Sequence, residues 1–264
     1  GDFNVALGHN SLENNTTASN NTAVGKSALG LNTTGADNNA FGSGALDANT
    51  TANDNNAFGT GALGLNTTGT QNTAMGHAVL DANTTGSNNT GFGALALTGN
   101  TTANNNTAIG HSALKENTTG TTNAALGSSA LLSNTTGGYN TGLGHQTLKL
   151  NTTGGWNVAV GVNSLLNNTA SENTAVGAGC LQANTSGTKN VAVGTYALDT
   201  NTTASNNTAI GYDSLTANTT GTNNVAVGYQ SLLSNTTGTQ NVAMGDRALD
   251  ANTTANFNVG VGAF

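Results

Sequence analysis

Four histidines are the side chains in this chain best suited to bind a metal ion, and each directly follows a glycine. They are His9, His77, His111 and His145. The last three are spaced 34 residues apart, which is two periods of the 17-residue repeat described below. Stacked coils would hold neighbouring histidines about 10 Å apart, whereas the ligands of a zinc ion must all lie about 2 Å from it. Such spacing allows a shared ion only where the same histidine comes from several chains, as in a ring of three. For the single chain we expect solvated histidines, no metal site and no cofactor.

Aromatic side chains form two regularly spaced pairs that are candidates for contact with a glycan. Tyr139 and Trp156 are 17 residues apart, and so are Tyr212 and Tyr229. Neighbouring aromatic faces offer a large contact area at a low entropic cost. Plain stacking of one ring on the next explains the same spacing equally well, so both interpretations stay open.

Carboxylates also recur in register, and paired carboxylates are the usual groups for calcium binding or acid–base chemistry. Asp37 and Asp54 share one position of the pattern, and Asp47 and Asp81 share another. Nothing else converges on them, so we expect solvated charges that discourage lateral aggregation. With no nucleophile beside a base and no phosphate-cradling loop, the sequence predicts that the chain is not an enzyme.

The composition excludes several function classes. Only 6% of the 264 residues are charged, the net charge is −7 and proline is absent. A nucleic-acid-binding surface needs a basic stripe, and a membrane span needs roughly 20 consecutive apolar residues; the chain has neither. We therefore expect neither nucleic acid as a partner nor a membrane span in this segment.

A recurring glycine divides residues 1–264 into a tandem repeat. Fourteen of the fifteen gaps between these glycines are 17 residues long, and the gap from Gly161 to Gly177 is 16 because one threonine is missing near 169–171. Asn always stands four residues before the glycine, Leu four residues after it, and Asn-Thr seven and eight residues after it. We interpret 1–264 as a single uninterrupted array and as a fragment of a longer fibre.

A period of this length, rich in glycine and β-branched residues, predicts an all-β parallel β-solenoid with 17 residues per coil and about 15 coils. One strand is expected in Asn-Thr-Ala-Val-Gly and a second through the Ala-Leu segment, with Asn-Thr-Thr-Gly as the return turn. Stacked coils place identical residues above one another, so each Asn column is expected to form an amide ladder. The Leu column and the apolar column just before the glycine are expected to fill the interior.

The middle column of the first strand contains only Ala or Gly, and we expect it to lie outside the coil as an oligomer interface. Restriction to small residues is the result expected where another chain's backbone approaches closely. If the Ala/Gly column points into the coil instead, the alternate residues of the strand point outward and expose a stripe of Val, Ile, Phe and Met, which also requires a partner. The interface column is Ala6, Ala23, Ala40, Ala57, Ala74, Gly91, Ala108, Ala125, Gly142, Ala159, Ala175, Ala192, Ala209, Ala226, Ala243 and Gly260.

The strand motif resembles the head repeats of trimeric autotransporter adhesins, and it is similar to arrays in phage tail-fibre-like proteins. Asn157-Val158-Ala159-Val160-Gly161 carries the resemblance, as does the segment from Asn224 to Gly228. Adhesin heads repeat at about fourteen residues, whereas this coil adds Ala-Leu and Asn-Thr-Thr-Gly. The resemblance implies a left-handed β-roll that associates as a parallel homotrimer.

These observations predict a structural and adhesive fibre segment at the surface of a cell or virion. A stiff rod would project a binding tip, and many weak contacts with a host glycan or protein would add through multivalency. The alternative is an ice-binding protein that uses the Thr and Asn columns. Because neighbours such as Thr16 and Thr17 should point to opposite sides of an extended chain, only one Thr column is expected to face outward.

Overall fold

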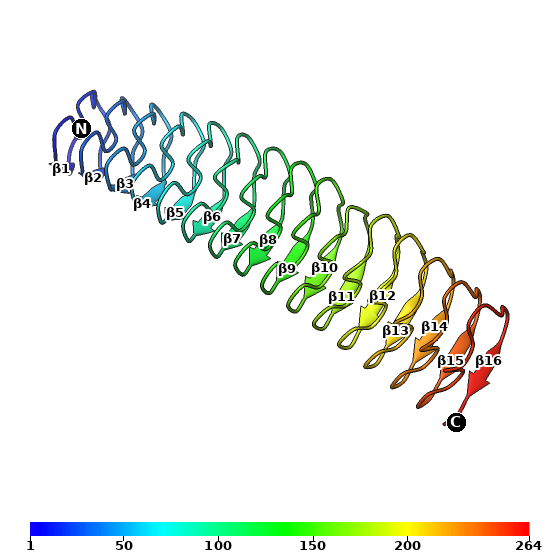
Figure 1. The fold of residues 1–264 in the computed structure, drawn as a ribbon. Helices are drawn as coiled ribbons and strands as arrows, with labels where there is room; N and C mark the ends of the chain where they lie inside the picture. Colours follow the sequence, from blue (N-terminus) through cyan, green and yellow to red (C-terminus); the bar gives the residue numbers. More distant parts are fainter. Residues whose placement is uncertain (264) are drawn as a thin grey trace. The chain divides into compact units, whose positions relative to one another are not determined.

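The computed structural model describes residues 1–263, which form two compact units, Gly1–Thr136 and Gly137 onward. Each unit is a β-solenoid with one short strand per coil, and strands of successive coils pair in parallel and in register (Figure 1). The predicted all-β solenoid with 17-residue coils is confirmed. The first unit contains β1 Val5–Leu7, β2 Thr22–Val24, β3 Asn39–Phe41, β4 Asn56–Phe58, β5 Thr73–Met75, β6 Thr90–Phe92, β7 Thr107–Ile109 and β8 Ala124–Leu126. The second contains β9 Thr141–Leu143, β10 Val158–Val160, β11 Thr174–Val176, β12 Val191–Val193, β13 Thr208–Ile210, β14 Val225–Val227, β15 Val242–Met244 and β16 Val259–Val261.

The second strand predicted through the Ala-Leu segment does not form, and a series of turns takes its place. In the coil after β2, Ser27 and Leu29 have φ angles of 55° and 51°. Their N–H groups link the coil to both of its neighbours: Ser27 donates to the carbonyl of His9 in the coil before, and Leu29 to the carbonyl of Ala45 in the coil after. Coil-to-coil hydrogen bonding therefore continues outside the strand.

The repeated glycine closes each strand in a conformation that side chains rarely adopt. Gly42 has φ of 141°, and a Cβ added there would lie 2.5 Å from the carbonyl carbon of Gly59 in the next coil. Both the backbone angle and the close approach of the next coil require glycine. The close spacing of the coils therefore requires glycine at this position of the repeat.

The interior is narrow enough for a leucine to reach the back of the strand, since a Cβ added at Gly260 would lie 2.7 Å from Cγ of Leu249. Leu29 and Leu46 are fully buried, and so are the strand-centre residues Ala23 and Ala40. Where the middle column has Gly91, its missing Cβ makes room for the larger Val79. A column facing Leu across so narrow a space can hold only a small residue.

This arrangement contradicts the expectation that the Ala/Gly column is an outer interface. From Ala23 to Ala243 the column is buried inside the coils, and only Ala6 and Gly260 in the end coils have exposed surface. The small residues are explained by the leucines of the same chain, so no second chain is needed to account for them. The expectation that the column before the glycine fills the interior is contradicted for the same reason.

Two asparagine ladders are confirmed, and they converge on the return turn. In the first, the backbone N–H of Asn38 donates to Oδ1 of Asn21 at 3.0 Å; in the second, Nδ2 of Asn49 donates to Oδ1 of Asn32 at 2.9 Å. The carbonyl of Gly35 accepts Nδ2 of both Asn21 and Asn32, each at 2.9 Å. Buried amides replace part of the apolar core by satisfying the turn's backbone groups.

The 16-residue coil keeps the contacts of the return turn and the first ladder although it lacks one threonine. The carbonyl of Ala170 accepts Nδ2 of Asn157 at 2.8 Å and of Asn168 at 2.7 Å, as the carbonyl of Gly35 does in a full coil. The backbone of Asn173 still donates to Oδ1 of Asn157 at 3.0 Å. The missing residue belongs to the exposed second Thr column, and beyond it the second ladder continues, with Nδ2 of Asn184 donating to Oδ1 of Asn168 at 2.7 Å.

Candidate functional site

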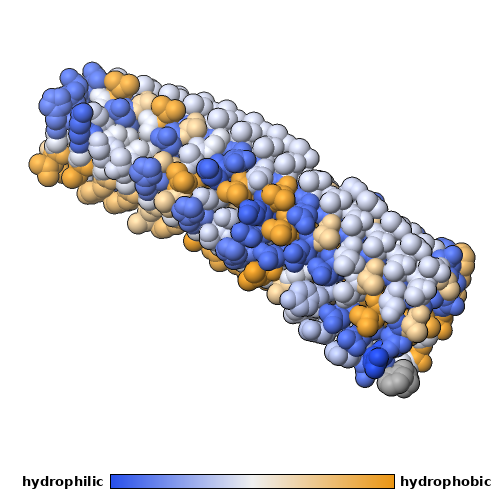
Figure 2. Space-filling view, in the orientation of Figure 1, coloured by the Kyte–Doolittle hydropathy of each residue, from blue (hydrophilic) through white to orange (hydrophobic). Residues whose placement is uncertain are grey.

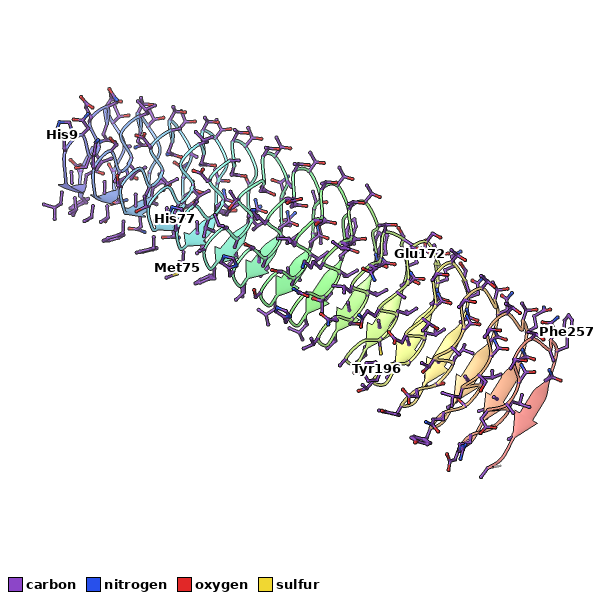
Figure 3. All side chains as sticks on the ribbon, viewed as in Figure 1. His9, Met75, His77, Glu172, Tyr196 and Phe257 are labelled. Carbon is purple, nitrogen blue, oxygen red and sulfur yellow. The ribbon has the colours of Figure 1, made fainter. Side chains whose placement is uncertain are left out.

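The outer face of the strands presents an unbroken column of apolar side chains in each unit. Because Ala points inward, the residue before the glycine points outward. Phe41 is 37% exposed and Ile109 is 39% exposed, and the rings of Phe41 and Phe58 stack with centroids 4.9 Å apart. Apolar side chains gather along the lower border of Figure 2, on the side of the first unit's strands, and Met75 lies there in Figure 3. We call this surface the strand face; in the first unit its column is Leu7, Val24, Phe41, Phe58, Met75, Phe92, Ile109 and Leu126, and in the second Leu143, Val160, Val176, Val193, Ile210, Val227, Met244 and Val261.

The strand face carries no charged side chain. The other outward column of the strands, at their first residue, holds Thr, Val, Asn or Ala, for example Thr107 in β7 and Val191 in β12. In the second unit several of these are valines, so both outward columns are apolar at β10, β12 and β14. A parallel sheet is normally covered on both faces, whereas this one is covered only by its own coil.

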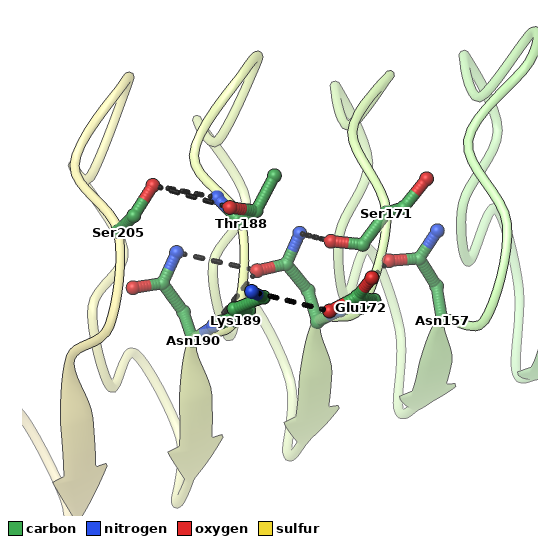
Figure 4. Close-up of polar contacts among 8 residues, drawn as sticks. Asn157, Ser171, Glu172, Thr188, Lys189, Asn190 and Ser205 are labelled. Carbon is green, nitrogen blue, oxygen red and sulfur yellow. Dashed lines mark hydrogen bonds and ion pairs between the residues drawn. The ribbon is translucent and has the colours of Figure 1, made fainter.

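The Thr columns lie on the return turn and differ in what their hydroxyls bind. Oγ1 of Thr33, in the first column, donates to the carbonyl of Thr50 at 2.9 Å. Thr34, in the second column, is exposed. Two residues after the second Thr column the turn also links coils, as where the backbone N–H of Thr188 donates to Oγ of Ser205 at 2.9 Å (Figure 4). The second Thr column is the more exposed of the two, since Thr33 is half-buried with its hydroxyl bound to the next coil whereas Thr34 is exposed.

The aromatic pairs differ in how much ring face they leave open. Tyr139 and Trp156 stack with centroids 4.1 Å apart and planes 6° apart, so each ring covers one face of the other. Tyr212 and Tyr229 are looser, at 5.8 Å and 14°. Tyr196, which the column spacing missed because it lies one position further along the turn, packs edgewise against Tyr212 at 6.5 Å and 81°.

The histidines do not come together in either unit. His9, His77, His111 and His145 each occupy the turn after the repeated glycine (His9 and His77 are labelled in Figure 3). Within residues 1–263, no group of three His, Cys, Asp or Glu side chains is arranged to hold a metal ion. A ring of histidines from several chains remains a prediction.

The aspartates of one column fold back over the preceding coil. Oδ1 of Asp47 lies 2.7 Å from the position a Cβ would take at Gly30, and Oδ1 of Asp81 lies equally close at Gly64. Partial burial raises the pKa of both carboxyls, although His77 lowers that of Asp81 in part. Burial, with a smaller contribution from Asp213, also raises the pKa of Asp199. The other pair, Asp37 and Asp54, occupies a left-handed position, at φ of 59° and 60°.

These raised pKa values predict that acid stabilises the fold through Asp47, Asp81 and Asp199. A folded pKa above the unfolded value means that the folded state holds the proton more tightly, so stability is greatest below the unfolded pKa, near 3.8, and falls as pH rises through the folded pKa. We expect denaturant midpoints measured from pH 3 to pH 7 to decrease less steeply in the triple variant Asp47→Asn/Asp81→Asn/Asp199→Asn than in the native chain. Equal slopes in the two chains would contradict this.

Residues 1–263 contain no helix that could cross a membrane. Comparison with known proteins gives no match to a family model and no match among curated proteins, so the resemblance to adhesin heads and tail fibres rests on the strand motif alone.

Proposed function

We propose that this chain is a structural fibre segment whose copies associate through the strand face. The observation that carries the proposal is the uncharged, outward apolar column present at every strand. Soluble monomers rarely expose continuous apolar patches larger than a few hundred Å². Eight coils at a strand spacing of about 4.8 Å, with strands about 10 Å long, give each unit a patch near that limit.

A second copy is the partner that best fits this surface. Its strand face has the same spacing between coils, so the apolar side chains of one copy can lie between those of the other along a whole unit. Two sheets packed face to face lie about 10 Å apart with their side chains interdigitated. The resemblance to adhesin heads favours three parallel copies, while the exposed column by itself fits two or three.

The mechanical role follows from the repeat. Ladders running from coil to coil resist bending, and repeated weak contacts gain strength through multivalency. We propose an adhesive appendage outside a cell or on a virion, with a role in support and attachment rather than in catalysis.

Three charges on the strand face should dissociate the assembly. We expect the variant Met75→Lys/Phe92→Lys/Ile109→Lys to have the mass of a single chain by light scattering at concentrations where the native chain is oligomeric, because an unpaired buried charge is strongly unfavourable.

The matched control places the same three lysines in the same three coils but on the exposed second Thr column, as Thr85→Lys/Thr102→Lys/Thr119→Lys. This variant should keep the native mass, and circular dichroism should show that both variants are folded. A native chain that is monomeric at every concentration would overturn the proposal, as would equal dissociation by both variants.

Ice binding is the rival proposal, and the exposed second Thr column is the observation that favours it. The first column is less suited to it, because hydroxyls such as that of Thr33 are already bound to backbone carbonyls. Thermal hysteresis of the native chain that is lost on replacing Thr85, Thr102 and Thr119 by Lys would favour ice binding over the fibre segment. Hysteresis no greater than that of an unrelated protein would count against it.

A further inference from the structure

Departures from the repeat concentrate on one edge of the second unit, along the turn after the repeated glycine. Three of the four tyrosines in the chain lie there, Tyr196, Tyr212 and Tyr229, together with its one arginine, Arg247. In other coils the same two columns mostly hold small or polar residues such as Ser43. Because the fold is built equally well with those residues, the solenoid does not require large aromatic side chains at this edge.

The three rings form an open arrangement. Tyr196, Tyr212 and Tyr229 are 44%, 48% and 50% exposed. The ring of Tyr196 lies against Gly179 of the preceding coil, where a Cβ would come within 2.7 Å of its Cδ1. Since the planes of Tyr196 and Tyr212 are 81° apart, the two rings make a corner instead of a closed stack. The tight pair Tyr139 and Trp156 makes no such corner.

Carboxylates adjoin these tyrosines along the turn: Asp213 directly follows Tyr212, and the backbone N–H of Asp199 donates to the carbonyl of Tyr196 at 3.3 Å. Asp199 and Asp213 lie close enough for their charges to interact, and Asp199 is partly buried, which also raises its pKa. Arg247 is held by Asp250, with Nε 3.0 Å from Oδ2. Its charge is therefore already balanced, and the edge keeps a net negative charge.

We propose that the aromatic edge formed by Tyr196, Tyr212 and Tyr229 binds a neutral oligosaccharide. The C–H groups on the face of a pyranose ring carry partial positive charge, which the negative face of an aromatic ring attracts. Asp199 and Asp213 accept hydrogen bonds from sugar hydroxyls, and their charge repels sialylated or sulfated glycans. No pocket encloses the edge in the described part of the chain, which fits a shallow contact with one side of an extended glycan. This site goes beyond the proposed fibre role and does not depend on self-association.

Saturation-transfer NMR on the full chain tests the proposal, with linear hexaoses of glucose, mannose and galactose as neutral probes and sialyllactose as the anionic probe. We expect transfer to ring C–H protons of at least one hexaose and none to sialyllactose. In Tyr196→Ala/Tyr212→Ala the Kd should rise at least about tenfold, the effect of losing about 1.4 kcal/mol of binding free energy.

The matched control is Tyr139→Ala/Trp156→Ala, which removes two exposed rings from the same unit and should leave the Kd unchanged. Circular dichroism of both variants checks that the coils are intact. The proposal is overturned if no neutral hexaose shows transfer, if sialyllactose binds as well as the hexaoses, or if the two double variants lose binding equally. Because the experiment measures binding per chain, a monomeric native protein would overturn the fibre proposal without affecting the proposal of glycan binding at the aromatic edge.

Discussion

Gly42→Ala is expected to lower the free energy of unfolding by about 2–6 kcal/mol. Strain at a φ of 141° costs an alanine about 1–3 kcal/mol. Overpacking costs a further 1–3 kcal/mol or more, because the new methyl group would meet the backbone of Gly59 rather than a side chain that can move. The adjacent coils must separate, and this weakens the pairing of β3 with β4.

Gly44→Ala is the matched control, two residues further along the same turn. Gly44 has φ of 68°, and a Cβ there would have no atom within 4 Å. The same position holds Ser27 and Ala78 in other coils, at φ of 55° and 51°. We therefore expect a loss of about 1 kcal/mol, the cost of a left-handed alanine.

Hydrogen exchange read by mass spectrometry locates the effect, and denaturant unfolding measures its size. In a solenoid each coil contacts only its neighbours, so Gly42→Ala should lose protection mainly around β2 to β4. Similar losses of stability in the two variants would show that the glycine column is not fixed by the approach of the next coil.

The repeat period predicts the parallel stacking and both Asn ladders, because a residue that recurs in every coil lies directly above the same residue of the coil before. The repeat period does not predict which residues of the strand point into the coil and which point outward. The strand is only three residues long, and in Val191-Ala192-Val193 both outward and inward residues are apolar, so alternation alone cannot identify the buried face. The leucine column opposite determines it, since the narrow interior admits Ala beside Leu and excludes a second large side chain.

The repeat predicts neither the left-handed turns nor the aromatic edge, for different reasons. Leu29 favours no left-handed conformation, so tertiary packing overrides its local preference. The sequence does hold one indication of left-handed turns. Asn and Asp tolerate positive φ better than most residues, and Asn20, Asp37 and Asn88 occupy such positions. The repeat does not indicate the contact of Tyr196 with Tyr212, because the two residues stand in adjacent columns and the geometry of the turn brings them together.

Asn55→Ala tests whether the ladders hold the coils together, and we expect it to cost about 3–5 kcal/mol. The buried Asn55 side chain accepts the backbone N–H of Asn72 at 3.0 Å and Nδ2 of Asn72 at 3.2 Å, and it donates to the carbonyl of Gly69 at 2.9 Å. Nδ2 of Asn72 keeps its bond to Gly86, and the Gly69 carbonyl keeps Nδ2 of Asn66. The backbone N–H of Asn72 is left unpaired and buried, at about 1–3 kcal/mol, and the other two hydrogen bonds of the Asn55 side chain are lost at about 1 kcal/mol each.

Asn53→Ala provides the comparison, two residues before Asn55 in the same turn. Asn53 is exposed and its Oδ1 accepts one hydrogen bond, from the backbone of Ala36 at 2.7 Å, a group that water can satisfy instead. Ala36 occupies the same column one coil earlier, so the repeat already tolerates alanine there, and the cost should stay below about 1 kcal/mol. Both variants lose one asparagine, so the difference between their free energies of unfolding, measured with denaturant, gives the contribution of the ladder. If Asn55→Ala proves as mild as Asn53→Ala, the coils must be held by the leucine column and backbone pairing alone.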